Sequence, residues 1–407
     1  MSLINLLRKI GVVILGTIVV LAFLELGVRL IHPHAFYPSL MYPSEQLGYI
    51  LKPDVRGRAT NLLAEFDVAE QANHEGFRDT DHPLEKPSHT YRIAFLGDSF
   101  TEAHQVEEKE TFVRRIETSL RRQWNGDKAP RVECMNFGIS GYDTQQEVLC
   151  YENAVRKYKP DMVVLAVYVN NDFSGNLFYL RESNFGRPYF RLTDGKLQKI
   201  EADSKTLWSN YEKSIRHEGD CWYKHLHLYN LQKDVLQFIR DRRRRKTVDP
   251  VDPKDSQSVQ KFWSGFAIHR FHYYLVPADD YVKQVDAITR LLLQRLERDV
   301  AADGGRFCAI LLPGEENVFP EKWPNKVKQY PGLENFQLDF SRPFERASQF
   351  LPDIAKRGDI LDLRPAFREA TAKGSLFLKH DMHYNHWGQE SVANAVAPWL
   401  EKKLPGK

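Results

Sequence analysis

A short polar segment directly follows an apolar run near residue 95, and its residue types allow two interpretations. Within YRIAFLGDSFTE, the run Ile93–Leu96 ends at Gly97-Asp98-Ser99. Gly, Asp and Ser are the usual residues of turns, so the segment could be only a turn. Alternatively, it presents the Ser99 hydroxyl as a nucleophile at the carboxyl end of a strand, where open α/β folds place their chemistry.

Three further segments carry polar residues at comparable places in the chain. NFGISGYDT (Asn136–Thr144) and VNNDF (Val169–Phe173) come at the ends of predicted strands, and HDMHYNHWGQE (His380–Glu390) precedes the last predicted helix. The carboxyl ends of parallel strands meet at one edge of a sheet, where ligands bind in open α/β folds. We therefore expect these segments to converge with Ser99.

The order and spacing of these four segments resemble the motifs of the SGNH, or GDSL-type, hydrolase superfamily. The GDS triplet alone would be a weak signal, and its three companions make the resemblance specific. It covers Arg92–Asp172 and Asp359–Lys402. NHEGFRD (Asn73–Asp79) also resembles a segment of a membrane-anchored bacterial subgroup, often met among exopolysaccharide-related proteins. The fold that the resemblance implies is a flavodoxin-like α/β sandwich.

The resemblance also implies a role for particular residues. Ser99 would be the nucleophile, and a serine hydroxyl needs a base that takes its proton. His383, in His-x-Asn-x-x-Gly, would be that base, and Asp381 would orient its imidazole and stabilise the cation. The donors to the developing oxyanion would be the backbone N–H groups of Ser99 and Gly141 and the side-chain amide of Asn171.

The chain departs from the family pattern in two places. Most members place the acid three residues before the histidine, whereas Asp381 comes two before it, as in alginate-type acetyltransferase relatives. Val169 stands where the family has glycine, which would narrow the pocket or shift the loop. Asp381 could instead cap the last helix. His380 and His386 match no motif and are interpreted as structural; their spacing is not that of a zinc site, so we expect no metal and no cofactor.

Apolar patterning predicts alternating strands and helices, hence a parallel sheet. Met162–Val169 is a continuous apolar run, as expected for a central strand covered on both faces. Thr144 and Glu147 match a capping box, which predicts that a helix begins there and runs towards Tyr158. The predicted fold is a flavodoxin-like three-layer α/β/α sandwich. Its other expected strands are Arg92–Leu96, Arg131–Asn136, Arg306–Leu312 and Asp359–Leu363, and its other helices are Thr111–Trp124, Tyr281–Ala301 and Ser391–Lys402.

The N-terminal segment predicts a membrane anchor. Residues 10–31 reach the length of about 20 residues that a membrane span needs. Glu25 and Arg29 lie four residues apart, as an ion pair on one helix face does. Arg8 and Lys9 precede the apolar run, which places residues 1–9 in the cytoplasm and the bulk of the chain outside it, in the periplasm. A cleaved signal peptide is the alternative interpretation.

The rest of the chain divides into a membrane-proximal linker and one domain. We assign residues 32–90 to the linker and 91–402 to the hydrolase domain, with an insertion at about 174–277. The insertion is expected to hold one or two helices, the best at Tyr229–Arg240, followed by a disordered basic loop containing DRRRRK (Asp241–Lys246). Such a loop is either solvated or in contact with lipid phosphates or an acidic polymer.

Composition narrows the class of function. The net charge of +3 over 407 residues argues against a nucleic-acid-binding protein. Four scattered cysteines do not make a disulfide framework. We predict a serine esterase that hydrolyses small acyl esters, such as acetyl groups on a carbohydrate or exopolysaccharide, through an acyl-serine intermediate. The alternatives are an O-acetyltransferase using the same residues and a non-catalytic scaffold of the cell envelope.

Overall fold

A five-stranded parallel sheet forms the centre of the protein, as the sequence predicts. The structure, a computed structural model, describes residues 3–31, 41–61, 65–124, 130–179, 186–218, 226–246, 256–263, 269–327, 330 and 332–405. The strand order is β11 (Ile360–Asp362), β10 (Arg306–Leu312), β7 (Met162–Tyr168), β5 (Thr90–Gly97), β6 (Arg131–Gly138). Numbered along the chain, this is the flavodoxin-like order, whose ligand crevice lies where the order reverses, between β5 and β7.

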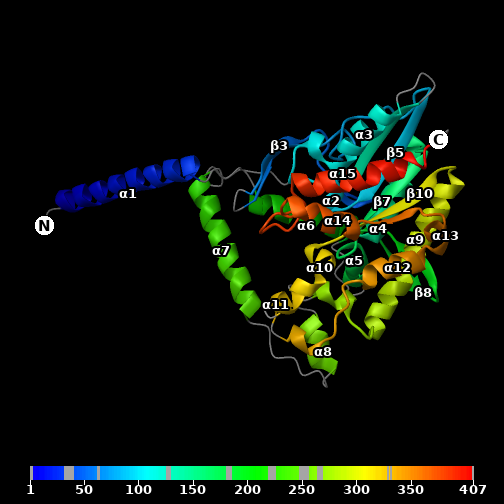
Figure 1. The fold of residues 1–407 in the computed structure, drawn as a ribbon. Helices are drawn as coiled ribbons and strands as arrows, with labels where there is room; N and C mark the ends of the chain where they lie inside the picture. The colour runs from blue at the N-terminus through cyan, green and yellow to red at the C-terminus, as the bar shows by residue number, and fades with distance from the viewer. Residues whose placement is uncertain are drawn as a thin grey trace.

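Helices cover both faces of the sheet, which makes three layers (Figure 1). Alternate side chains of β5 enter two separate cores, because successive residues of a strand point to opposite faces. Ile93 and Phe95 pack in one core and Ala94 and Leu96 in the other. The first core holds α3 (Phe112–Gln123), α14 (Arg364–Ala370) and α15 (His386–Glu401); the second holds α4 (Thr144–Cys150), α9 (Asp280–Ala302) and α12 (Arg342–Phe350).

The helix α4 begins at Thr144 as predicted but has a different cap, and the last helix begins earlier than predicted. The capping residue of α4 is Asp143, whose carboxylate accepts from the N–H groups of Gln145 and Gln146 at 2.9 and 3.4 Å. The predicted capping box is therefore wrong, and the Thr144 hydroxyl instead donates to the carbonyl of Asp172 at 3.1 Å. The last helix, α15, begins five residues before the prediction, because Asn385 supplies its N-cap.

The insertion contains more helix than expected. The helix α7 (His227–Lys246) continues through the arginine run, so the prediction of a basic loop at 241–246 is wrong. Arginine is among the better helix formers, and no Gly or Pro interrupts the segment. The other described elements of the insertion and of the region after it are β8 (Tyr189–Thr193), β9 (Lys196–Ile200), α5 (Asp172–Tyr179), α6 (Ser204–Glu218), α8 (Ser256–Trp263), α10 (Glu315–Val318), α11 (Trp323–Val327) and α13 (Pro352–Lys356).

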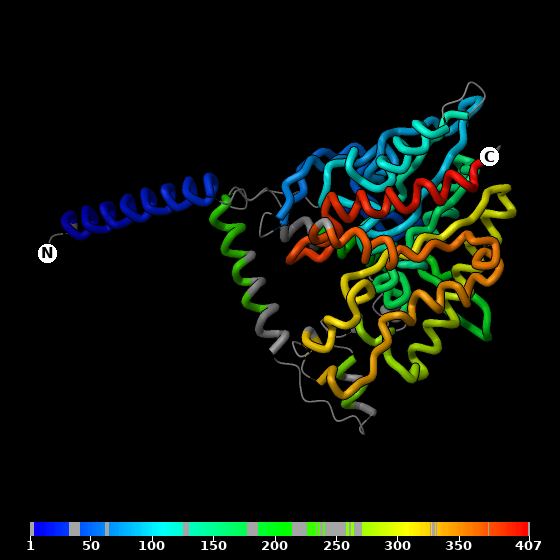
Figure 2. Tube along the Cα trace, in the orientation of Figure 1, coloured from blue at the N-terminus to red at the C-terminus, as the bar shows by residue number. Residues whose placement is uncertain are grey.

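The N-terminal helix α1 (Leu3–Ile31) is long and apolar enough to cross a membrane. It projects away from the rest of the chain, as the tube in Figure 2 shows. Arg8 and Lys9 lie within the helix rather than ahead of it. The expected pair of Glu25 and Arg29 forms, with Nε to Oε1 at 2.7 Å.

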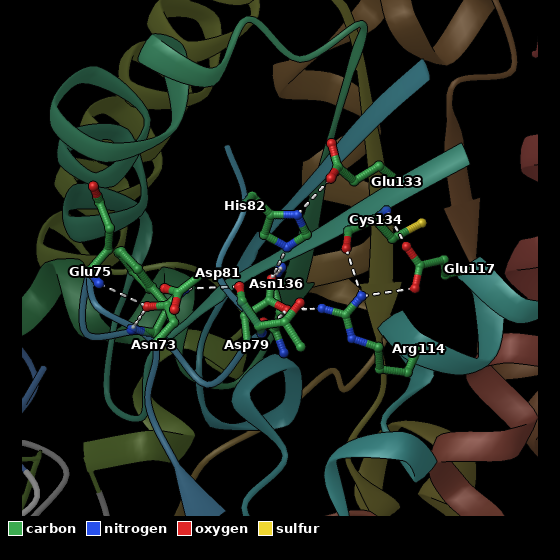
Figure 3. A network of polar contacts seen from close by, with 12 residues as sticks. Asn73, Glu75, Asp79, Asp81, His82, Arg114, Glu117, Glu133, Cys134 and Asn136 are labelled. Atoms are coloured by element: carbon green, nitrogen blue, oxygen red, sulfur yellow. Dashed lines mark hydrogen bonds and ion pairs between the residues drawn. The ribbon is translucent and has the colours of Figure 1, made fainter. Parts of the chain in front are cut away.

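Two hairpins and a polar loop precede the sheet and pack against it. The hairpins are β1 (Met41–Ser44) with β2 (Gly48–Leu51) and β3 (Arg56–Thr60) with β4 (Asp67–Gln71). In the loop that follows, the Asp79 carboxylate accepts from the N–H of Asn136 in β6 at 2.7 Å and contacts Arg114 of α3 (Figure 3). His82 bridges Asp79 and Glu133 at 3.1 and 2.9 Å. The predicted linker is thus folded onto the sheet.

Candidate active site

Ser99 lies at the start of a single helical turn, α2 (Ser99–Glu102), directly after β5. Asp98 caps this turn, because its Oδ1 accepts from the N–H of Phe100 at 2.9 Å. A glycine is required before the cap: a Cβ at Gly97 would lie 2.2 Å from Oγ1 of Thr101 and 3.1 Å from the carbonyl of Ala166. The segment is therefore a turn, and it also places the Ser99 hydroxyl at the switch point of the sheet.

A buried arginine from the NHEGFRD segment supports the carboxyl end of the same turn. The guanidinium of Arg78 donates to the carbonyls of Glu102, Ala103 and Val106 at 3.1, 2.7 and 2.7 Å. It also pairs with Glu70 of β4 at 3.0 Å, and both side chains are fully buried. These contacts satisfy carbonyl groups that a helix end leaves without partners. Sequence reasoning gave Arg78 no role, although the resemblance of its segment was noted.

His383 lies on a tight hairpin that leads into α15. Its carbonyl accepts from the N–H of Leu378 at 2.8 Å, and the next residue, Tyr384, is fully buried with its hydroxyl donating to the carbonyl of Pro313 at 2.7 Å. Met382, just before the histidine, has a φ of 70°. A left-handed conformation is uncommon for residues other than glycine. It reverses the chain here between Asp381 and His383.

The structure brings the three predicted catalytic side chains into one chain of contacts. Ser99 Oγ lies 2.7 Å from His383 Nε2, and His383 Nδ1 lies 2.5 Å from Asp381 Oδ1. Burial raises the pKa of Asp381, but the hydrogen bonds from His383 and the charges of His383 and His104 together outweigh it and hold the pKa below its ordinary value. Asp381 is therefore a carboxylate at neutral pH, as a group that orients an imidazole must be. The two-residue spacing is compatible with this contact because Met382 turns the chain.

The alternative role of Asp381 as a helix cap is wrong, because Asn385 takes that place. Oδ1 of Asn385 accepts from the N–H groups of Trp387 and Gly388 at 2.9 and 3.1 Å. His386 is the first residue of α15, and its ring lies against that of Trp387. It is not part of the contact chain with the serine.

Gln389 of α15 connects the histidine side of the site to the serine side. Its Oε1 accepts from the N–H of Phe112 in α3 at 2.8 Å, and its Nε2 donates to the carbonyl of Phe100 in α2 at 3.2 Å. The Phe100 ring lies 4.7 Å from the ring of His383, between centroids. The sequence gave no sign of this residue, because its partners are backbone groups far away in the chain.

Two of the three predicted oxyanion donors have no acceptor within the described part of the chain. These are the backbone N–H groups of Ser99 and Gly141. Gly141 has a φ of 79°, and a Cβ there would lie 2.8 Å from the Tyr49 hydroxyl, so the position favours glycine. The amide of Asn171 instead donates to Oδ2 of Asp98 and to the carbonyl of Tyr142, at 3.0 and 2.8 Å.

The carboxyl groups of Asp98, Asp143, Glu147 and Asp172 are buried on this side of the sheet. Burial raises the pKa of Asp98 to about 6, opposed by hydrogen bonds from Phe100 and Asn171, and that of Asp143 to about 7. Burial and the neighbouring carboxyls raise the pKa values of Glu147 and Asp172 well above the ordinary range. Glu147 and Asp172 are therefore protonated at neutral pH, whereas Asp98, next to Ser99, is largely ionised.

Two polar residues that the sequence did not single out hold the loop of Asp381. The Glu65 carboxylate accepts from the N–H groups of His380 and Asp381 at 3.0 and 3.1 Å. The amide of Gln105 lies 3.4 Å from Oδ1 of Asp381. His380 thus helps to hold this loop through its backbone N–H, in agreement with the structural role predicted for it.

The chain matches one family model, and the matched region includes the histidine loop. Residues 273–407 match the model described as "SGNH hydrolase-like domain, acetyltransferase AlgX". Residues 273–407 are thus similar to an SGNH hydrolase-like domain. The resemblance of the chain to SGNH and GDSL-type hydrolases, predicted from four short motifs, is thereby confirmed.

Several solved structures are similar to this chain at low sequence identity. One is TesA, with 11% identity, a TM-score of 0.36, and coverage of 77% of this chain and 99% of that chain. Another is an acetyl xylan esterase, AlAXEase, with 13% identity, a TM-score of 0.35, and coverage of 76% and 98%. A third is a lipase/acylhydrolase from Enterococcus faecalis, with 11% identity, a TM-score of 0.37, and coverage of 78% and 98%. No curated protein matches the chain significantly.

Proposed function

We propose that this protein is a serine esterase that removes small acyl groups, of the acetyl type, from a carbohydrate. The observation that carries the proposal is the continuous contact from Ser99 Oγ through His383 to Asp381, at 2.7 and 2.5 Å. A hydroxyl within hydrogen-bond reach of an imidazole that is itself oriented by a carboxylate is the arrangement of an activated nucleophile.

The proposed reaction has two halves. In the first, Ser99 Oγ attacks the ester carbonyl while His383 Nε2 accepts the hydroxyl proton, and the N–H groups of Ser99 and Gly141 stabilise the oxyanion. The intermediate then expels the sugar alkoxide, which takes the proton from His383 and leaves an acyl-serine. In the second, water gives its proton to His383 and its oxygen to the acyl carbon. The bond between the acyl carbon and Ser99 Oγ then breaks, Ser99 takes the proton back from His383, and the acid leaves as product.

Transfer to a second sugar is the alternative outcome of the same intermediate. A carbohydrate hydroxyl would replace water in the second half of the reaction, and no other residue would need to change. The family model that matches residues 273–407 is described as an acetyltransferase, which favours this alternative. The nature of the acceptor, rather than the nucleophile, separates the two functions.

Ser99→Ala and His383→Ala, alone and together, test the proposal. Each single variant is expected to lose turnover of a p-nitrophenyl acetate-type ester, and the double variant should be no worse, because residues that act as one unit are non-additive. A fluorophosphonate probe should label wild type and not Ser99→Ala. Ser391→Ala on α15 is the matched serine control. Additive losses, or turnover that survives without Ser99, would overturn the nucleophile–base pair and favour the scaffold alternative.

Acceptor dependence separates the esterase from the acetyltransferase. Wild type is incubated with an acetyl ester in water, with and without a deacetylated polysaccharide. Release of free acetate at equal rates in both conditions supports the esterase. Transfer of acetate to the polysaccharide, in place of its release as free acetate, supports the acetyltransferase.

We further propose that α1 stays on the mature protein as an anchor and that the domain lies outside the cytoplasm. The length and hydropathy of the helix, and Arg8 and Lys9 near its amino end, support this proposal. Membrane fractionation with N-terminal sequencing of the mature protein tests it. A soluble product that begins after about residue 30 would be a cleaved protein and would overturn the anchor.

A further inference from the structure

The helix α7 of the insertion begins beside the outer end of α1 and is bonded to it. The Glu25 carboxylate of α1 accepts from the N–H groups of His227 and Leu228, at 2.9 and 2.8 Å. These are the first two residues of α7, whose N–H groups have no partner within their own helix. A residue of the apolar helix thus caps a helix that lies about 200 residues later in the chain, so the starting point of α7 is fixed relative to α1.

The position of Glu25 in α1 sets the depth at which α7 begins. The uninterrupted apolar run Ile10–Leu24 ends directly before Glu25. Fifteen helical residues span about 22 Å, which already accounts for most of the hydrocarbon thickness of a bilayer. If α1 crosses a membrane, Glu25 and the amino end of α7 lie where hydrocarbon gives way to lipid headgroups. Figure 1 shows that α7 then leads away from the axis of α1 rather than along it.

The sequence of α7 has the pattern of a helix that lies in a membrane surface. Leu228, Leu231, Val235 and Ile239 recur at intervals of three or four residues and so share one face. The helix carries seven Lys and Arg residues against two Asp, and its last seven residues are RDRRRRK. Amphipathic helices rich in Lys and Arg bury an apolar face at the boundary of headgroups and acyl chains.

The apolar face of α7 is open to its surroundings beyond the first turns. Val235, Leu236 and Ile239 are 45%, 45% and 40% exposed, although α7 belongs to a folded chain. Leu228 and Leu231, nearer to α1, are partly buried. These exposed apolar residues lie next to a helix able to span a membrane. The surface of that membrane could cover them.

We infer that α7 lies on the surface of the membrane that α1 crosses, on the side of the SGNH hydrolase-like domain. Its apolar face would enter the headgroup boundary, and its basic carboxyl end would bind anionic lipid headgroups. The inference rests on the proposed anchoring by α1. Two helices, α1 and α7, would then contact the membrane. One side of the domain would be held near the lipid surface.

A fluorescent label that reports on lipid contact tests this inference in the full-length protein. The protein is reconstituted into vesicles of phosphatidylcholine, alone or mixed with phosphatidylglycerol. Cys221→Ser is used as background, because Cys134, Cys150 and Cys308 are buried. An NBD label is attached at Ile239→Cys, and at Lys233→Cys as the control on the polar face. We expect a blue shift and quenching by spin-labelled lipid at position 239, and quenching by aqueous iodide at position 233.

Two further variants resolve the contributions of charge and of the cap. Replacing Arg242, Arg243, Arg244 and Arg245 by glutamine should abolish any increase in lipid quenching that phosphatidylglycerol gives. Glu25→Ala should reduce lipid quenching at position 239 while the protein remains in the vesicles after carbonate extraction.

The outcomes that would overturn the inference are distinct from a failure of the anchor. If the protein stays in the vesicles but both labels are equally accessible to iodide, α7 does not lie on the membrane. A label at position 239 that is protected only by an added anionic polysaccharide, without lipid contact, would identify a polymer as the partner instead. Release of the whole protein by carbonate would show that α1 is not an anchor.

Discussion

The two loops that carry the predicted catalytic pair are held in opposite ways. The turn that bears Ser99 is enclosed: Asp98, Phe100, Thr101 and Glu102 are buried, and a buried arginine binds its last carbonyls. The hairpin that bears His383 lies at the surface, and Met382 beside it is 52% exposed. Damage to the first loop should therefore reduce stability and activity together, whereas damage to the second should affect mainly activity.

The largest effect on stability is expected from Arg78→Met. The substitution leaves Glu70 buried without its partner and removes the donor to four carbonyls. Breaking a buried ion pair costs about 3–5 kcal/mol. Urea denaturation should show this loss, and ester turnover should fall with it because α2 loses its support. Arg58→Met is the matched control, because Arg58 pairs with Asp67 at 2.8 Å on the exposed side of the neighbouring hairpin. That control should cost less than about 1 kcal/mol.

Equal losses from the two arginine substitutions would contradict this account. They would mean that Arg78 acts as one more surface charge. The turn of Ser99 would then hold its shape through Asp98 and Gly97 alone.

Asn171→Ala should combine the two kinds of damage. If the amide of Asn171 exchanges one of its two present acceptors for the oxyanion, removing this donor costs about 10²–10³ in kcat. Stability should fall as well, because the amide binds Asp98 and Tyr142, and leaving a buried acceptor unpaired costs about 1–3 kcal/mol. Esterase kinetics and thermal melts separate the two effects.

The neighbouring asparagine provides the control for this prediction. Asn170 binds Glu316 and Tyr274, away from the serine. Asn170→Ala should therefore lower the melting temperature and leave kcat within about tenfold of wild type, the scale of about 1.4 kcal/mol. If Asn171→Ala turns over the ester as fast as wild type, Asn171 serves only the turn.

The buried carboxyls of the serine side predict how stability depends on pH. Burial raises the pKa of Asp98 to about 6 and that of Asp143 to about 7, both from 3.8. These groups bind more protons in the folded protein than in the unfolded chain between about pH 4 and 7. The free energy of unfolding should therefore fall as the pH rises through this range.

Thermal melts of wild type and Asp143→Asn across this pH range test whether stability falls as the pH rises. Asparagine also caps helices well, so the substitution keeps the start of α4 while removing the titration. The variant should show a flatter dependence between about pH 4 and 7. A wild-type melting temperature that rises steadily towards about pH 7 would contradict the prediction.

The smallest effect is expected from Met382→Gly on the histidine hairpin. A left-handed conformation costs about 1–2 kcal/mol for residues with a Cβ, and glycine adopts it freely, at some cost in entropy. Stability should thus change by less than about 1 kcal/mol, with Asp381 and His383 still paired. Met382→Val, a β-branched residue at positive φ, should lower kcat more than the glycine does. Equal kinetics for both variants would show that the backbone conformation at Met382 does not position Asp381 relative to His383.

Local patterns predicted the sheet and the positions of the polar segments. The continuous apolar runs that became β5, β7 and β10 are the pattern of strands covered on both faces, and the strand ends carry Ser99 and Asn171 as expected. Nearness of Ser99, His383 and Asp381 followed from the resemblance and from the geometry of a parallel sheet. Their catalytic roles remain predictions.

What the sequence could not predict depends on contacts between distant segments. Arg78 and Gln389 act on backbone carbonyls and N–H groups, which are the same whatever the residue type, so no pattern announces them. Asp143 replaced Thr144 as the cap of α4 because both residues suit that position, and the tertiary packing decided between them. The helical state of the arginine run was missed because charge was taken as a sign of a loop.

Gln389 has a consequence for how the chain can be divided. Ser99 and His383 lie 284 residues apart, yet one amide joins α15 to both α2 and α3, and β7 pairs directly with β10. None of these contacts needs an unbroken chain through the insertion. We therefore expect a protein cut between Lys246 and Ser256 to reassemble from its two fragments, each inert alone. Only the stretch between these two residues should tolerate such a cut, because Phe190 and Tyr273 of the insertion pack in the same core as the sheet.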